Sequence, residues 1–187
     1  GWYGFNPGST LGITPSGYAQ AAARVVVTTT LAAASGGITV CLLEKMLGSK
    51  TWDVGAVCNG ILGGLVSITA GCSVTYPWAA ALIGFLGGFV YFGSSKCVLK
   101  LMKVDDPLDA FAVHGACGFW GVISAACFAA PEYAYSQTFE PEGIFYGGAD
   151  ALAAAICFLL ATIGWVCTMS ALMFLPLKFL GLLRVAA

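Results

Sequence analysis

Long apolar segments, separated by residues typical of turns, dominate the pattern of hydrophobic and polar positions along this chain. The segments cover residues 18–43, 54–72, 77–101, 107–130 and 149–177. Each has about 19 to 29 residues, and about 20 helical residues cross the ~30 Å apolar core of a bilayer. The ten-residue alternation typical of membrane barrels does not occur. The pattern predicts an all-α polytopic membrane protein with about five complete transmembrane helices, and we interpret residues 1–5 as the end of a sixth.

The composition supports lipid as the solvent of this chain. Of its 187 residues, 59% are hydrophobic and 9% are charged, and the mean hydropathy is +0.87. A soluble domain has about 25% charged residues. The net charge of −1 and the lack of a basic patch argue against nucleic-acid binding. Because the chain begins with Gly1 rather than Met and has no signal-peptide pattern, we expect an internal piece of a longer membrane protein.

The eight cysteines indicate packing rather than chemistry. None forms a CxxC pair, and most lie in apolar segments, where cysteine acts as a small polarisable side chain. Cys72 falls in a predicted loop and has no evident disulfide partner. No metal site and no cofactor are expected.

The connections between the apolar segments contain residues typical of turns and helix starts. We expect Asp53 to cap the helix that follows it and Pro77 to begin the next helix. The basic residues outside the spans are Lys45, Lys50, Lys96, Lys100, Lys103, Lys178 and Arg184. If the five spans alternate in direction, these residues all lie on one side of the membrane, which the positive-inside rule identifies as cytoplasmic. The acidic 130–150 loop is then external.

Glycines recur three or four residues apart in three of the predicted spans. They are Gly60, Gly63 and Gly64; Gly84, Gly87 and Gly88; and Gly115, Gly118 and Gly121. This spacing places them on one helix face, where two backbones can approach closely. We expect tight helix packing. The alternative is that a bare glycine face widens a pore or leaves space for a side chain.

The segment DDPLDAFAVHGACG, residues 105–118, holds three of the nine acidic residues and the only histidine. Asp105 and Asp106 precede Pro107, which suits the first position of a helix. Acidic groups there are stabilised by the helix dipole and by unpaired N–H groups, so we interpret both as capping residues. Asp109 lies one turn deeper, where a carboxylate requires a partner.

His114 is predicted about 13–14 Å along the helix axis from Asp105, near the bilayer midplane. An unsatisfied imidazole at that depth is costly, so we expect it to face protein or a cavity. On an α-helix its face also holds Ala110, Cys117, Gly118 and Gly121. Two interpretations stay open: a neutral imidazole bonded to a neighbouring helix, and a titratable group in a conduction path.

Arg24 is the other intramembrane charge, and it precedes a run of three threonines, residues 28–30. It begins close to the predicted outer edge of its span. We expect its side chain either to reach toward the interface or to pair with a buried carboxylate.

Several segments resemble ammonium transporters of the Amt/MEP/Rh family. DDPLDAFAVHGACGFWG resembles the signature of the family's tenth transmembrane helix. GWYGFNPGS resembles the end of the sixth helix, RVVVTTTLAAASGGITV and NGILGGLVSITAGCSVTYPWAAALIG resemble helices seven to nine, and GLLRV resembles the end of the eleventh. The likeness runs in order over nearly the whole chain. Arg24 before the threonine run, together with YPWAA, favours the eukaryotic Amt type.

The resemblance implies a fold of eleven transmembrane helices in two inverted halves, assembled as a homotrimer in the plasma membrane. Residues 1–187 would be the C-terminal part of the transporter domain, from the end of helix six to helix eleven, without the N-terminal half and the cytoplasmic tail. The implied activity is ammonium uptake, with ammonia crossing an apolar pore and methylammonium as an analogue. The expected partners are this substrate and the lipid bilayer, and no enzymatic activity is expected.

The family's pore residues carry over to three positions of this sequence. His114 corresponds to the second of the paired pore histidines, Phe5 to one phenylalanine of the outer gate, and Ser9 to a hydroxyl of the outer recruitment site. The first histidine, the second gate phenylalanine, the recruitment tryptophan and the fifth-helix carboxylate would lie outside this chain. The chain would therefore supply half a pore.

Four further residues correspond to positions beside the pore in the family. Asp106 and Asp109 match acidic residues at the inner end of the helix that carries the histidine. Trp2 and Thr69 match positions near the pore or its support.

Two other functions compete with transport. One is a sensor or signalling protein on the same scaffold, which would bind ammonium and report through a cytoplasmic domain. The other is an intramembrane enzyme with His114 as a base beside Asp109. No serine or cysteine nucleophile is convincingly placed with them, and a separation of five residues puts the two on different helix faces. The sequence therefore disfavours the enzyme.

Overall fold

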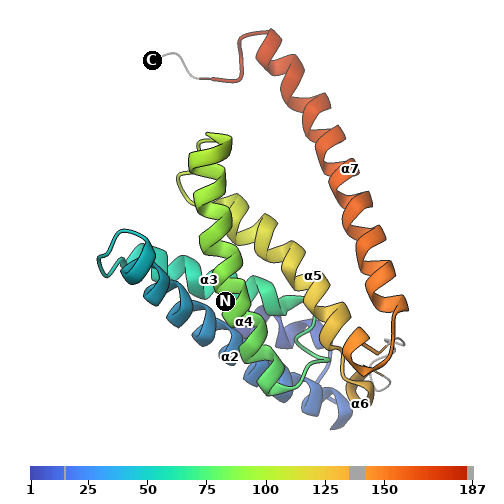
Figure 1. The fold of residues 1–187 in the computed structure, drawn as a ribbon. Helices are drawn as coiled ribbons and strands as arrows, with labels where there is room; N and C mark the ends of the chain where they lie inside the picture. The colour runs from blue at the N-terminus through green and yellow to red at the C-terminus, as the bar shows by residue number, and fades with distance from the viewer. Residues whose placement is uncertain (15, 135–141, 185–187) are drawn as a thin grey trace.

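The structure is a computed structural model that describes residues 1–14, 16–134 and 142–184. Helices make up all the regular secondary structure of these residues (Figure 1). The long helices are α2 (Ser16–Leu47), α3 (Val54–Thr69), α4 (Pro77–Lys96), α5 (Cys117–Phe128) and α7 (Asp150–Phe179). Two π-helical turns extend them, with η2 (Cys97–Met102) after α4 and η3 (Phe111–Ala116) before α5. The short elements are α1 (Trp2–Phe5), η1 (Pro7–Thr10), α6 (Pro131–Ala134) and η5 (Ile144–Tyr146).

The observed helices follow the predicted spans in order, and their ends differ from the prediction by a few residues. Four helical stretches are long and apolar enough to cross a membrane: 17–47, 77–102, 111–128 and 150–179. The fifth, α3, has 16 residues and stops at Thr69, three residues before the predicted end. It stops because residues 68–74 form successive turns, in which Gly71 N–H donates to the Ile68 carbonyl and Val74 N–H to the Gly71 carbonyl. As predicted, Asp53 caps α3 by accepting from Ala56 N–H, and Pro77 is the first residue of α4.

Glycines let α2, α3 and α4 approach closely, as their spacing predicts. A Cβ added to either Gly64 or Gly84 would run into the carbonyl oxygen of Ala32 on α2. A Cβ on Gly88 would lie 2.7 Å from Cβ of Thr39. On α5, a Cβ on Gly121 would lie 3.0 Å from the Ser67 carbonyl oxygen. The prediction of tight packing is therefore confirmed at these positions.

Most hydroxyl groups buried between the helices bond to main-chain carbonyls, and Thr29 Oγ1 instead accepts from the Asn6 amide at 3.1 Å. Thr28 Oγ1 donates to the carbonyl of Cys72 at 2.8 Å, which ties α2 to the turn after α3. Ser67 donates within α3 to the Gly63 carbonyl at 2.7 Å. Since an unbonded hydroxyl in an apolar interior costs free energy, these bonds allow polar residues in the core.

Within the described residues, Arg24 meets a main-chain carbonyl and an aromatic ring and not a buried carboxylate, which was one of its two predicted alternatives. Its Nε donates to the Ser73 carbonyl at 3.0 Å, and the guanidinium carbon lies 3.8 Å from the ring centroid of Tyr133. A guanidinium group fits this setting because it is planar and weakly hydrated. At the opposite end of the bundle, Lys96 forms an ion pair of 3.0 Å with Glu44.

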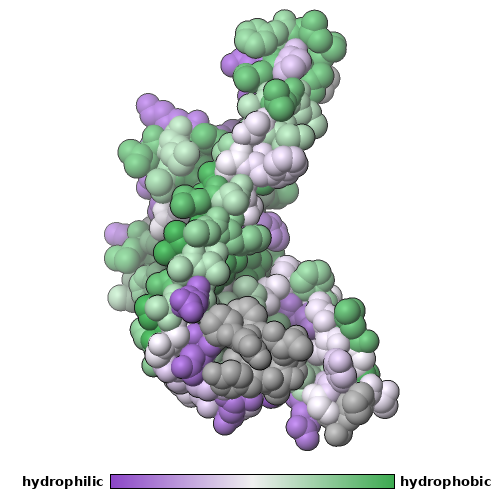
Figure 2. Space-filling model, turned by 90° about the vertical axis from the view of Figure 1, so that its right-hand side faces the viewer, coloured by the Kyte–Doolittle hydropathy of each residue, from purple (hydrophilic) through white to green (hydrophobic). Residues whose placement is uncertain are grey.

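The last long helix, α7, packs on the rest of the chain only near its beginning. Its only buried residues are Ala151 and Ala155, and in Figure 1 its later turns run apart from the other helices. Large apolar side chains such as Phe158, Trp165 and Phe179 are exposed. Figure 2 shows a mainly hydrophobic surface on this side of the molecule, with most hydrophilic residues toward its lower end and its edges.

All eight cysteines are free, as expected. Residues 135–141 of the 130–150 loop lie outside the described residues, and the external position of the loop stays a prediction.

Candidate functional site

The segment that leads into α5 differs from the predicted helix start. Pro107 and Leu108 form a turn, Asp109 has a left-handed backbone with φ 55°, and the helix begins at Ala110. Pro107 is therefore not the first helical residue, and Asp109 lies before the helix rather than one turn into it. Asp106 caps this start, since its carboxylate accepts from the N–H groups of Ala110 and Phe111 at 2.9 and 2.8 Å. Asp105 makes no such bond within the described part of the chain.

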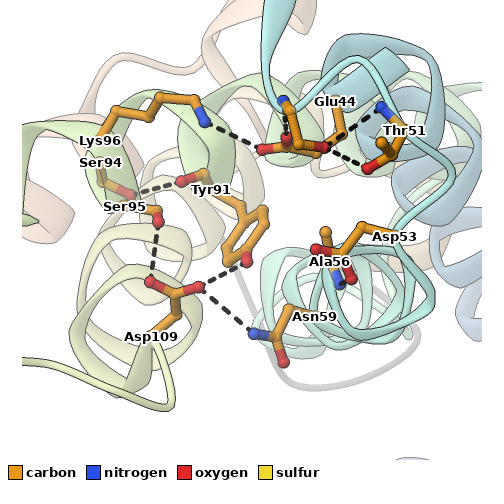
Figure 3. A network of polar contacts seen from close by, with 11 residues as sticks. Glu44, Thr51, Asp53, Ala56, Asn59, Tyr91, Ser94, Ser95, Lys96 and Asp109 are labelled. Atoms are coloured by element: carbon orange, nitrogen blue, oxygen red, sulfur yellow. Dashed lines mark hydrogen bonds and ion pairs between the residues drawn. The ribbon is translucent and has the colours of Figure 1, made fainter.

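The Asp109 carboxylate has the hydrogen-bond partners that were expected for it, and they come from two other helices (Figure 3). Tyr91 on α4 donates its phenol to Oδ2 at 2.7 Å, and Ser95 on α4 donates to Oδ1 at 2.7 Å. Asn59 on α3 donates to Oδ2 at 3.4 Å. The Asp109 carboxylate therefore fixes the start of η3 against α3 and α4.

His114 is exposed on the surface of this chain. Of the four residues predicted to share its face, Ala110 is also exposed and Gly118 is half-buried, whereas Cys117 and Gly121 are buried. The Cys117 thiol contacts the Gly87 carbonyl, and Gly121 packs against α3. Because η3 is π-helical, with hydrogen bonds spaced five residues apart, it winds less per residue than an α-helix, which turns His114 relative to Cys117. Within the described residues the imidazole has no hydrogen-bond partner, so the predicted bond to a neighbouring helix is not found here.

Trp2, Phe5, Ser9 and Thr69 lie close together at the other end of α3. Trp2 Nε1 donates to Thr69 Oγ1 at 3.0 Å, and the ring centroids of Trp2 and Phe5 are 6.1 Å apart. Ser9 Oγ donates to the Phe5 carbonyl at 2.7 Å, and the Phe5 side chain is 61% exposed. The structure therefore brings these four predicted site residues together.

Helix α3 connects this aromatic group to the Asp109 carboxylate. Thr69, near its end, holds Trp2, and Asn59, near its beginning, holds Asp109. Asn59 and Thr69 are ten positions apart, which corresponds to about 15 Å along a helix axis. The predicted site residues thus form two groups at different depths, each tied to the same helix.

Sequence reasoning missed Asn59, Tyr91 and Ser95. Each is a hydrogen-bonding side chain in a span made mainly of apolar and small residues, and a buried polar group requires a partner. This requirement could have marked the three residues as members of a hydrogen-bond network, but it does not identify Asp109 as their shared partner. Among the described residues, no three His, Cys, Asp or Glu side chains are placed to hold a metal ion.

The sequence profile described as the Ammonium Transporter Family matches residues 1–187. Ammonium transporter 1 member 2 of Oryza sativa subsp. japonica is 46% identical over the whole chain, and Ammonium transporter 1 member 1 of Arabidopsis thaliana is 42% identical. The chain spans 40% and 39% of these two relatives.

Solved structures give the same result for the fold. The crystal structure of Saccharomyces cerevisiae Mep2 matches 98% of this chain with a TM-score of 0.85 and 26% identity, over 41% of that protein. A structure described as a sensor Amt protein matches 99% of the chain with a TM-score of 0.84 and 30% identity, over 42% of its length.

The fold and the apolar helices define a helical membrane protein of the transporter class. More particularly, the chain belongs to the ammonium transporter family. The resemblance found in the sequence is thereby confirmed, and so is the prediction that the chain is not an enzyme.

Proposed function

We propose that residues 1–187 form the C-terminal part of an ammonium transporter that works as a multi-pass homotrimer in the plasma membrane. The family match over the whole chain supports this proposal, as does the likeness to ammonium transporters more than twice its length. The basic residues at one end of the bundle are then cytoplasmic. In the full-length transporter, the remaining helices cover the exposed face that carries His114.

The group at the outer end is suited to recruit ammonium. The indole N–H of Trp2 is bonded to Thr69, so the ring face remains available to a cation. The Ser9 hydroxyl donates its hydrogen bond to the Phe5 carbonyl. The lone pairs of the Ser9 oxygen therefore remain free to accept from an ammonium N–H. Aromatic faces and a hydroxyl oxygen can together replace part of the hydration shell that the ion loses.

The path beyond Phe5 favours the neutral form of the substrate. Apolar surroundings disfavour a charged group, so they lower the pKa of ammonium and promote loss of a proton. Ammonia then crosses, and an imidazole can bond it as donor or as acceptor. His114 is the residue of this chain that fills that role, and an imidazole, which can both accept and donate a proton, can also relay the released proton. Potassium has no proton to lose and is rejected.

The observation that carries this proposal is an exposed imidazole on a helix long and apolar enough to span a membrane. The test is His114→Ala in the full-length protein, with uptake of ammonium and potassium measured per molecule in the membrane. Thr168→Ala, on exposed α7, is the control. We expect selective ammonium uptake to fall strongly in His114→Ala and to persist in the control; unchanged selectivity in His114→Ala would refute the pore role.

A sensor is the second candidate, favoured by the 30% identity to a protein described as a sensor Amt protein. The region that follows residue 187 in the full-length sequence discriminates the two. A short tail supports transport alone, whereas an attached signalling domain supports sensing.

A further inference from the structure

The Asp109 carboxylate joins three elements that are far apart in the sequence. Its donors Tyr91 and Ser95 lie on α4, and Asn59 lies on α3. A carboxylate offers about four acceptor positions. With three of them occupied by protein donors, this group is placed to hold a segment in position rather than to exchange partners with a moving substrate.

The same carboxylate residue begins the turn that carries His114. Val113 N–H donates to the Asp109 carbonyl at 2.8 Å, so the first backbone bond into η3 starts at this residue. Its φ of 55° lies in the left-handed region, which aspartate adopts more readily than most residues other than glycine. The bonds from Tyr91 and Ser95 hold the carboxylate of this same residue.

Packing reinforces this anchor on one face of η3 only. Ala112 and Val113 are 0% and 2% exposed, and they lie in one apolar cluster with Tyr91. Tyr91 therefore holds η3 twice, by its ring against the cluster and by its hydroxyl on Asp109. His114, the next residue after Val113, is on the exposed side of the same turn.

We infer that Tyr91 and Ser95, acting through Asp109, are positioning residues that set the depth and rotation of His114 in the conduction path. This inference rests on the proposed function. The Tyr91 and Ser95 hydroxyls hold Asp109 in place, and Asp109 holds the start of η3. The position of η3 then sets the direction of the His114 imidazole. Without the bonds, η3 can relax toward a regular α-helix, which rotates His114 toward the face of Cys117.

The test uses Tyr91→Phe, Ser95→Ala and the double variant in the full-length transporter. Each change removes a hydroxyl and keeps the rest of the side chain. Ser94→Ala is the matched control, because the Ser94 hydroxyl bonds only to the Val90 and Tyr91 carbonyls of its own helix. The readouts are the amount of protein in the membrane, the maximal ammonium uptake per molecule, and the KM.

In the double variant we expect maximal uptake per molecule to fall about tenfold, because small misplacements of a functional group have effects of this order or larger. KM should change less than about twofold, since the recruitment group lies at the other end of α3. Ser94→Ala should match the wild type. If the double variant does not reach the membrane, the single variants test the inference. Each should show a smaller loss of maximal uptake per molecule, again with little change in KM.

Uptake per molecule equal to that of Ser94→Ala would overturn the inference, and so would a change confined to KM. The outcome for His114→Ala separates this failure from failure of the proposed function. If His114→Ala loses selective uptake while the Tyr91 and Ser95 variants keep it, the transport role of His114 stands and only the positioning role falls. If His114→Ala also keeps it, the proposed function itself fails.

Discussion

The indole nitrogen of Trp2 lies 3.0 Å from the hydroxyl of Thr69, a bond between residues 67 positions apart. It fixes the aromatic group at the beginning of the chain to the end of α3. Because Phe5 lies against Trp2, the same bond also restrains the ring proposed as a gate.

Replacing Thr69 with Val should weaken recruitment of ammonium. The change keeps the shape of the side chain and removes the acceptor of the Trp2 N–H. Since a hydrogen bond of this kind contributes about 1 kcal/mol, we expect KM in the full-length transporter to rise about fivefold, with maximal uptake nearly unchanged.

Thr168→Val is the matched control for this experiment. Both hydroxyls donate to the carbonyl four residues earlier in their own helix, but only Thr69 also accepts from another element. The same KM in both variants would contradict the role of the Trp2–Thr69 bond.

Gly84→Ala should destabilise the bundle, since the new Cβ would meet the carbonyl of Ala32. Overpacking of this kind costs about 1–3 kcal/mol, so the midpoint of thermal unfolding in detergent should fall by several degrees. Gly93→Ala, on the same helix with nothing within 4 Å of the added Cβ, should not lower it. Equal midpoints for the two variants would show that α2 and α4 do not pack through Gly84.

The hydropathy pattern predicted an all-helical chain with long apolar helices in the observed order, because a lipid solvent requires long apolar stretches. It overestimated α3, whose end is set by the turn around Gly71 rather than by hydropathy. The start of η3 was also missed. There, Asp109 adopts a left-handed conformation, and its carboxylate is held by donors 14 and 18 positions away. Such contacts depend on the packing of α4 and cannot be obtained from local sequence.

The candidate site was predictable as a set of residues but not as an arrangement. The family signature identified His114 and Asp109, whereas regular α-helical spacing placed His114 on one face with Ala110, Cys117, Gly118 and Gly121. The structure exposes Ala110 with His114 but buries Cys117 and Gly121. The π-helical turn contributes to this split, since it changes the phase of the helix within one segment. Asn59, Tyr91 and Ser95 became identifiable only through their bonds to Asp109.

Cys72 should resist alkylation at neutral pH, although it lies in the turn after α3 rather than in a helix. Burial raises the pKa of its thiol to about 11, and the side chain is 8% exposed. Only the thiolate reacts, so raising the pH from 7 to 9 remains below that pKa and should leave labelling of Cys72 low. Mass spectrometry after iodoacetamide treatment measures this, with exposed Cys97 as the internal comparison. Equal labelling of both cysteines would contradict the burial of Cys72.

The central claim is that the imidazole of His114 lines the path of ammonia, and a structure of the full-length protein in a lipid nanodisc tests it most directly. The account predicts that His114 faces an apolar tunnel between the two halves, opposite a second intramembrane histidine, with Phe5 nearer the tunnel's outer mouth. A ring directed at lipid, or separated from every tunnel by packed helices, would contradict it.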